Sequence, residues 1–417
     1  MKTLKAIVAK YNATSLILRI LVGLIVGAVL AVLVPGAGWL EEFGNLFVGA
    51  LKGIAPVLVF VIVASALAQG TSKLDRRFGT VIWLYMLTTF LAAAIAAITS
   101  FLFPQTIVLA EAAESEVVPQ GLGEVLNTLL TNFVANPVSA LLNGNYIGIL
   151  FWACLFGLAM KKYGAESTKV FLANTADAVS QIVRWIINLA PFGIMGLVYT
   201  NVVSNGLSIF TQYGRLLALL VGTMLFMALI VSPLIIFIYL HCNPYPLVFR
   251  CLKESGLTAF FTRSSAANIP VNMTLCDKLG LDKDMYSVSI PLGATINMDG
   301  AAITITIMTL AAANTLGLQV SLPAAILLSV MSALGACGAS GVAGGSLLLI
   351  PMACSLFGIS NDIAMQVVGV GFIIGVVQDS VGTALNSAGD VEFAATAEYH
   401  QWLKEGKSLP EFLGGKK

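Results

Sequence analysis

Residues 293–300 read GATINMDG and interrupt an otherwise apolar run of about 287–316. Such a run is long enough to cross a bilayer as a helix, which takes about 20 residues. On a regular helix Asn297 and Asp299 would face different directions, so a joint role requires an unwound turn. Unwinding frees carbonyl oxygens, which together with carboxylates are the ligands that a hard cation such as sodium prefers. Gly300 is expected to make this break inexpensive.

The wider region carries acidic residues but no lysine or arginine. Between Lys283 and Lys404 the chain has no lysine or arginine, yet mostly apolar sequence there carries Asp299, Asp379 and Asp390. Carboxylates in a low-dielectric setting must be protonated or matched by positive charge. Because no side chain nearby in sequence supplies that charge, a mobile cation is the economical partner. The pattern indicates a cation-coupled membrane transporter.

Composition places the rest of the chain in a bilayer too. Of the 417 residues 58% are hydrophobic and 10% charged, and the mean hydropathy is +0.91, unlike a water-soluble globule of this length. A net charge of +1 without basic runs argues against nucleic acid as a partner. Six scattered cysteines without CxxC spacing indicate neither a zinc site nor a disulfide framework.

Apolar spans before residue 250 predict six membrane helices. The expected ranges are 15–34, 46–68, 81–103, 146–160 with an amphipathic approach from about 121, 181–203 and 215–240. We expect the first to be a retained helix and not a signal peptide, because no small-residue cleavage site follows it.

Loop charges orient these helices, since cytoplasmic loops carry an excess of lysine and arginine. The basic residues expected inside are Lys2, Lys5, Lys10, Lys73, Arg76, Arg77, Lys161, Lys162, Lys169, Arg250 and Lys253. The intervening loops carry Glu41, Glu42, Glu111, Glu114 and Glu116. Both termini are therefore expected on the cytoplasmic side.

After residue 250 the apolar runs become short, and two breaks recur. One is Thr262–Pro270 (TRSSAANIP) and the other is Gly335–Gly345 (GACGASGVAGG). Each break is flanked by apolar residues, which predicts a re-entrant helical hairpin reaching the middle of the membrane. Backbone at that depth is tolerable only within protein or around a cavity, and a pair of such segments points to a transporter binding site. Ordinary small-residue packing helices are the alternative.

The last apolar helix, expected at about 363–396, carries one polar stripe. Its members follow i, i+4, i+7 and i+11 spacing: Asp379, Thr383, Asn386 and Asp390. The positions between them are apolar, so the stripe is expected to face the protein interior. Capping or interhelical hydrogen bonding near a helix end is the alternative, which would account for Asp390 with Glu392 but not for Asp379 in mid-span.

A weaker polar pattern lies in the third helix. Tyr85, Thr88 and Thr89 share a face through i, i+3 and i+4 spacing. Threonine hydroxyls in membrane helices usually bond to their own backbone, so this pattern alone favours a structural role.

Together these motifs resemble the dicarboxylate/amino acid:cation symporters, the glutamate-transporter homologues, and among them the bacterial sodium-coupled serine/threonine branch. The resemblance covers essentially the whole chain. The motifs that carry it are Arg263-Ser264-Ser265, Asn297-Met298-Asp299-Gly300, the glycine-rich second break and the stripe from Asp379 to Asp390.

The resemblance implies an all-α polytopic membrane protein with eight transmembrane helices and two re-entrant hairpins. It also implies a homotrimer, surrounded by membrane lipid, in the bacterial cytoplasmic (inner) membrane. Residues 1–250 would form helices 1–6, mainly scaffold and trimer contacts, with helices 3 and 6 joining the transport domain. Residues 251–400 would form a transport core that moves like an elevator, and residues 401–417 a cytoplasmic tail.

Sodium is implied as the co-transported ion. One site would surround Asp390 with carbonyls of Gly293, Asn297 and Asn386. Another would combine Asp299 with Asn297, Tyr85, Thr88 and Thr89. A third draws on Thr295, Met298 and the second hairpin, where Ala333 and Ala336 replace the usual hydroxyl residues, so backbone oxygens would have to suffice.

The resemblance implies Asp379 as the partner of the substrate's amino group. The remaining substrate-binding residues would be Ser264, Ser265, Val342, Thr383 and Asn386. Acidic-substrate relatives carry an arginine at the position of Gly382 and a threonine at that of Ala301. Without that guanidinium a second carboxylate would be desolvated at high cost, so a small neutral amino acid such as serine or threonine is expected.

Arg263 leaves an alternative open, because it would restore uptake of acidic amino acids or dicarboxylates if it reached the site. Otherwise it would form an ion pair with Asp379 or a helix end. A proton-coupled carrier would use the same carboxylates in protonated form, and composition leaves a passive channel open. An intramembrane enzyme is disfavoured, since no GxSxG or HExxH motif occurs.

Overall fold

The computed structural model describes residues 14–69, 76–109, 131, 134–339 and 344–415, which form helices and turns without a β-strand. The predicted all-α class is thereby confirmed. Within these ranges five helices are long and apolar enough to cross a membrane, and one bent pair would make a sixth. This is the pattern of a multi-pass membrane protein. Eight spans with two hairpins stay a prediction.

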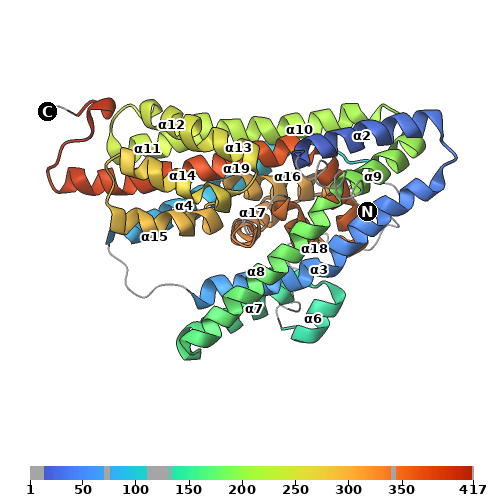
Figure 1. The fold of residues 1–417 in the computed structure, drawn as a ribbon, viewed down its shortest axis with the longest axis horizontal. Coiled ribbons are helices and arrows are strands. Elements are labelled where there is room, and N and C mark those ends of the chain that lie inside the picture. The colour runs from blue at the N-terminus through green and yellow to red at the C-terminus, as the bar shows by residue number, and fades with distance from the viewer. Residues whose placement is uncertain (1–13, 70–75, 110–130, 132–133, 340–343, 416–417) are drawn as a thin grey trace, which may run out of the picture.

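Helices from the first half of the chain form one packed group (Figure 1). Its members are α2 (Leu16–Leu33), η1 (Gly38–Leu40), α3 (Glu41–Ala68), α6 (Pro137–Asn143), α7 (Tyr146–Tyr163), α8 (Glu166–Asn188) and α9 (Ala190–Asn205). Helix α3 packs against α7, α8 and α9, and α2 lies along α9. The predicted helices 15–34, 46–68 and 146–160 are confirmed with shifted ends. The amphipathic approach expected from residue 121 falls largely outside the described residues.

The single helix predicted at 181–203 is wrong. The chain bends by 53° between α8 and α9. Pro191 lies in the first turn of α9. Because proline has no backbone N–H to donate and its ring clashes with the preceding turn, it kinks or breaks a helix, and here it accompanies the bend between α8 and α9.

The second group surrounds the long helix α19 (Asn361–Lys404), which extends beyond the predicted 363–396 at both ends (Figure 1). The surrounding helices are α4 (Arg76–Leu102), α10 (Ile209–Phe226), α11 (Ser232–Leu240), α12 (Tyr245–Cys251), α13 (Leu257–Thr262), α14 (Ser265–Lys278), α15 (Lys283–Ile296), α16 (Asp299–Thr315), α17 (Leu322–Ala336) and α18 (Ile350–Ser355). The short elements between and after them are η2 (Met227–Val231), η3 (Leu252–Gly256), η4 (Gly345–Leu349) and η5 (Glu411–Leu413). Helices α4, α10, α13, α14, α15 and α16 all contact α19.

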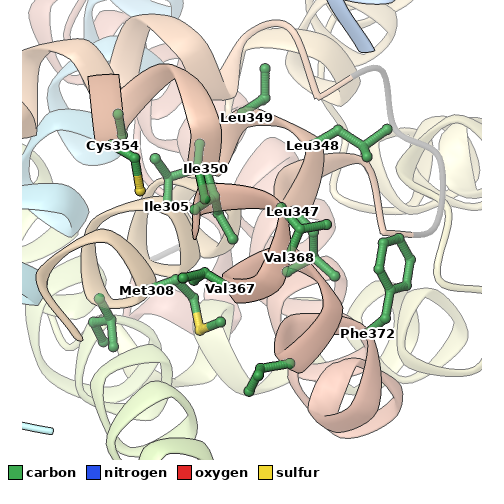
Figure 2. Packing of buried hydrophobic residues seen from close by; sticks show 14 of the residues in the cluster. Ile305, Met308, Leu347, Leu348, Leu349, Ile350, Cys354, Val367, Val368 and Phe372 are labelled. Atoms are coloured by element: carbon green, nitrogen blue, oxygen red, sulfur yellow. The ribbon is translucent and has the colours of Figure 1, made fainter. Parts of the chain in front are cut away.

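Apolar packing holds the return limb after the second break against the core. Figure 2 shows Leu347 and Ile350 of this limb beside Ile305 and Met308 of α16 and Val368 of α19. All five side chains are buried. Between helices in lipid, close packing of this kind provides the attraction that water exclusion provides in soluble proteins.

The unwound turn predicted around residue 297 is confirmed. Helix α15 ends at Ile296 and α16 begins at Asp299, with Asn297 and Met298 in non-helical conformations. Gly300 was expected to make the break inexpensive, but it lies inside α16 and has no positive φ, so the break does not use its conformational freedom. A Cβ at Gly300 would lie 2.4 Å from the Cα of Gly382. Glycine is required there because α16 and α19 approach each other closely.

Replacing Gly300 with alanine is expected to destabilise the protein by about 1–3 kcal/mol, since the added methyl group would overlap the backbone of Gly382. The thermal midpoint of the detergent-purified protein measures this effect. Gly222 in α10 has no atom within 4 Å of its would-be Cβ and provides the matched control. A Gly300→Ala protein as stable as the Gly222→Ala protein would contradict the close packing.

The first predicted hairpin breaks at Arg263 and Ser264, between α13 and α14. Arg263 has a φ of 51°, in the left-handed region that non-glycine residues rarely adopt. Ser264 accepts a hydrogen bond from the Ala267 N–H at 3.2 Å and so caps α14. The break is narrower than predicted, because Pro270 lies within α14.

The second predicted hairpin has a limb on each side of its break. Helix α17 ends at Ala336, and η4 begins at Gly345 after Gly344 with a φ of 73°. Residues 340–343 between them, with Val342, lie outside the described residues. The role expected for the Val342 carbonyl therefore stays a prediction.

Candidate functional site

The unwound turn between α15 and α16 faces the polar side of α4. Thr89 Oγ1 donates a hydrogen bond to Asp299 Oδ1 at 3.1 Å and accepts one from the Met298 N–H at 3.2 Å. Thr88 Oγ1 lies 3.3 Å from Asn297 Oδ1. Asp299 is 1% exposed, and its second oxygen, Oδ2, is buried with no hydrogen-bond partner among the described residues. The weak threonine pattern of the third helix thus lies against this buried carboxylate.

Asp390 forms a second buried centre beside the same turn. Asn297 Nδ2 donates to Asp390 Oδ1 and to the Asn386 carbonyl, each at 3.1 Å. Tyr85 donates its hydroxyl proton to the Asp390 carbonyl at 2.8 Å. A Cβ at Gly293 would lie 2.7 Å from Asp390 Oδ1, so the backbone of α15 passes directly beside the carboxylate. The three residues expected around Asp390 from the sequence, Gly293, Asn297 and Asn386, are brought together beside it, and Asp390 itself is fully buried.

Neither acid has a basic partner. Within the described parts of the chain no lysine or arginine forms an ion pair with Asp299 or Asp390. Their surroundings are hydroxyl, amide and carbonyl groups, which can turn oxygen atoms toward a cation. Oxygen-rich surroundings with one carboxylate each are suited to a hard monovalent ion.

Asp379 differs from the expectation that a mobile cation would match it. Arg263 Nε donates to Asp379 Oδ2 at 2.9 Å, and both side chains are buried. The Gly344 N–H donates to the same oxygen at 3.1 Å. The countercharge therefore comes from the first hairpin, outside the arginine-free stretch of sequence. Arg263 Nη1 is buried and unpaired within the described residues.

A polar cluster behind Asp390 was missed by the sequence reasoning. Asn272 Nδ2 lies 3.5 Å from Asp390 Oδ2 and donates to the Ser387 carbonyl at 3.0 Å. Asn268 Nδ2 donates to Ser387 Oγ at 2.8 Å and to Ser255 Oγ at 3.0 Å. These bonds join both limbs of the first hairpin to α19. The signal was the i, i+4 pair of asparagines in an apolar helix.

A pocket with about 330 Å³ of empty space, including its open mouth, lies between the hairpins and α19. The residues lining it are Arg263, Ser265, Met298, Gly300, Ala301, Ala339, Ser346, Gln378, Asp379, Gly382, Thr383 and Asn386. Five substrate residues expected from the sequence are thus brought together here: Arg263, Ser265, Asp379, Thr383 and Asn386. Ser346 and Gln378 were not predicted.

Some predicted site residues already form hydrogen bonds within the protein through their side chains. Ser264 is not among the lining residues, and its side chain caps α14. Thr295 donates its hydroxyl proton to the Leu292 carbonyl at 2.7 Å. Asn386 Oδ1 accepts a hydrogen bond from the Gly300 N–H at 2.7 Å. Of the residues predicted for the third sodium site, Met298 lies beside the Asp299 centre, where its N–H donates to Thr89 Oγ1.

The polar stripe of α19 faces inward as predicted. All four members are buried, whereas Val381 and Ala384 between them are half-buried and Val377, two positions before the stripe, is 43% exposed. Asp390 lies well inside a helix that ends at Lys404. The helix-capping alternative for Asp390 is therefore wrong.

Comparison with known proteins identifies the family to which this geometry belongs. The description of the matching family is "Sodium:dicarboxylate symporter family", and the match extends over residues 16–399. The chain belongs to the sodium:dicarboxylate symporter family. The resemblance drawn from the sequence is thereby confirmed, and the chain is a transporter and not an enzyme.

Members of the symporter family with high similarity come from several bacteria. A Bifidobacterium adolescentis protein named serine/threonine transporter SstT is 75% identical over 416 residues, or 100% of this chain and 97% of that protein. A Streptococcus agalactiae protein of the same name is 58% identical over 396 residues, covering 95% and 98%. One from Streptococcus thermophilus is 55% identical over 402 residues, covering 96% and 100%.

Proposed function

We propose that this chain imports the small neutral amino acids serine and threonine together with sodium ions, by secondary active transport. One observation carries the proposal: Asp299 and Asp390 are buried, and no basic side chain in the described ranges pairs with them. An uncompensated buried charge is strongly destabilising, and a bound cation would remove this penalty. The family description names sodium, and the relatives above are named for serine and threonine.

Coupling would follow from the same penalty. Sodium would neutralise Asp299 and Asp390, the amino acid would bind, and the second hairpin would close over the pocket. A site with an acid left ionised would be costly to move, since a charge at the bilayer centre costs at least about 2.5 kcal/mol. The fully loaded protein would therefore cross more readily than a partly loaded one.

A neutral substrate suits the charges of the pocket. An amino acid zwitterion would bring an ammonium group to Asp379 and a carboxylate toward Arg263, whose Nη1 is unpaired. The guanidinium group of Arg263 would then bind the single carboxylate of the substrate. A second carboxylate would find Gly382 where acidic-substrate relatives carry arginine, and it would lose its hydration without a bidentate partner.

The movement we propose is an elevator within a homotrimer in the bacterial cytoplasmic membrane, with both termini inside. The packing of α4, α10 and α11 around α19 supports their assignment to the moving domain with the hairpins. The separate packing of α2, α3, α7, α8 and α9 supports a scaffold role for them. Protein reconstituted with cross-links within the scaffold group should remain active, whereas cross-links from scaffold to α19 should arrest uptake.

Sodium-driven uptake is the direct test of the proposed function. Proteoliposomes with an inward sodium gradient should accumulate radiolabelled serine several-fold above its external concentration and release it chemically unchanged. Replacing sodium with choline should abolish accumulation. Accumulation driven by a pH gradient in the absence of sodium would instead support a proton-coupled carrier.

The unpaired Arg263 Nη1 favours one second candidate, uptake of acidic amino acids. Competition in the same vesicles separates the two. We expect unlabelled serine and threonine to inhibit serine uptake at concentrations far below those needed for aspartate. Strong inhibition by aspartate with none by serine would reject the neutral assignment.

A further inference from the structure

Gln378 lies directly before Asp379 on α19, lines the pocket and is 2% exposed. Its Oε1 atom is buried and has no hydrogen-bond partner within the described residues. A buried acceptor without a donor is unfavourable, and native proteins contain few of them. Because Gln378 lines a binding pocket, a ligand bound there can supply the missing donor.

The orientation of the Gln378 amide follows from its neighbours. Thr304 Oγ1 donates its single proton to the Gly300 carbonyl at 2.7 Å. Toward Gln378, 2.6 Å away, the same oxygen can therefore only accept, so Nε2 is the amide atom that faces Thr304. Thr304 is fully buried and is not among the lining residues. The amide nitrogen of Gln378 is thus held by its bond to Thr304, and the amide oxygen has no donor among the described residues.

We propose that Gln378 Oε1 accepts a hydrogen bond from the side-chain hydroxyl of the substrate and so selects serine and threonine over alanine. This inference rests on the proposed function, in which the pocket holds a small neutral amino acid. Asp379 would bind the ammonium group and Arg263 the carboxylate group, which all amino acids share. A hydroxyl group is what distinguishes serine from alanine, and its proton matches Gln378 Oε1, a fixed acceptor without a donor among the described residues.

Two serines in the same wall provide weaker discrimination. Ser265 and Ser346 both line the pocket, but a serine hydroxyl rotates and can either donate or accept. When alanine is bound, such a hydroxyl group can therefore rotate toward another hydrogen-bond partner. The Gln378 amide cannot turn without losing its bond to Thr304. Alanine would leave Oε1 buried and unpaired, and a site built around a hydroxyl rejects an analogue that lacks it.

The test compares inhibition constants of unlabelled serine and alanine for sodium-driven uptake of radiolabelled serine in proteoliposomes. In Gln378→Leu the preference for serine over alanine should fall about tenfold, the loss expected for one hydrogen bond. Thr304→Val removes the anchor of the amide and should lower the preference in the same direction. If Gln378→Leu fails to fold, Thr304→Val carries the test, and an unchanged preference there would overturn the inference.

Thr306→Val is the matched control, because Thr306 is also a buried threonine on α16 but does not line the pocket. It should leave the serine preference unchanged. An unchanged preference in Gln378→Leu, or its loss in Ser346→Ala alone, would overturn the assignment of Gln378. Wild-type vesicles are measured first: absence of sodium-driven serine uptake there would reject the proposed function itself, separately from the role of Gln378.

Discussion

Replacing Asp390 with asparagine is expected to raise the sodium concentration for half-maximal serine uptake by about 100-fold. The carboxylate is fully buried, and no basic side chain in the described residues pairs with it, so a bound sodium ion would be its main countercharge. Losing one partner of a buried charge pair costs about 2–5 kcal/mol, and each 1.4 kcal/mol is about tenfold in affinity. Asparagine keeps the shape and can still accept from Asn297 Nδ2, so folding should suffer far less than sodium activation.

The measurement is the sodium activation curve of serine uptake, with the thermal midpoint of the purified protein as the test of folding. Asp362→Asn is the control, because Asp362 lies near the start of the same helix in an exposed ion pair with Lys52 and does not line the pocket. Its sodium activation should stay close to that of the wild type. Unchanged sodium activation in Asp390→Asn would contradict the role given to this carboxylate.

Substitution of Asp379 with alanine is expected to abolish amino acid binding, with a loss of at least about 100-fold, while sodium binding stays measurable. The ammonium group of the substrate would lose its only carboxylate in the pocket. The same change leaves the buried Arg263 without its partner, which is itself destabilising. Asp379→Asn is therefore the companion variant, because an amide oxygen can still accept from Arg263 and from the Gly344 N–H.

Binding of serine and of sodium can be followed separately by ligand-induced shifts of the thermal midpoint. Asp362→Asn serves as a control on the same helix, since Asp362 lies near its start and pairs with Lys52 in an exposed ion pair. It should retain both responses. Serine binding of wild-type strength in Asp379→Asn would show that the substrate's ammonium group is held elsewhere.

Local patterns in the sequence were sufficient for much of the site. Helical spacing of Asp379, Thr383, Asn386 and Asp390 placed them on one buried face of α19, because side chains at such intervals point the same way on any regular helix. The separation of Asn297 from Asp299 by two positions required an unwound turn, and the turn is present. Both predictions concern residues close together in the chain.

Predictions that depended on contacts between residues far apart in the chain were less accurate. Helical spacing alone favoured a structural role for the threonines of α4. The family resemblance implied that they lie at Asp299, and the packing of α4 on the unwound turn brings Thr89 to that carboxylate. Gly300 was assigned to the break, whereas it is needed for contact with Gly382 on another helix. The asparagines of α14 show a signal in their i, i+4 spacing, but their contact with Ser387 and the bond of Gln378 to Thr304 could not be recognised, because each joins residues more than 70 positions apart in the chain.

The sequence by itself determined that acids in a long, arginine-free apolar stretch need positive charge from somewhere, because an ionised carboxylate is too costly in the membrane interior. Only the tertiary structure decided which source serves which acid. It brings Arg263, on a left-handed turn of the first hairpin, to Asp379, whereas no lysine or arginine in the part of the chain that the structure describes pairs with Asp299 or Asp390. The physical reason is that electrostatic pairing depends on distance through space, which the fold sets and the order of residues does not.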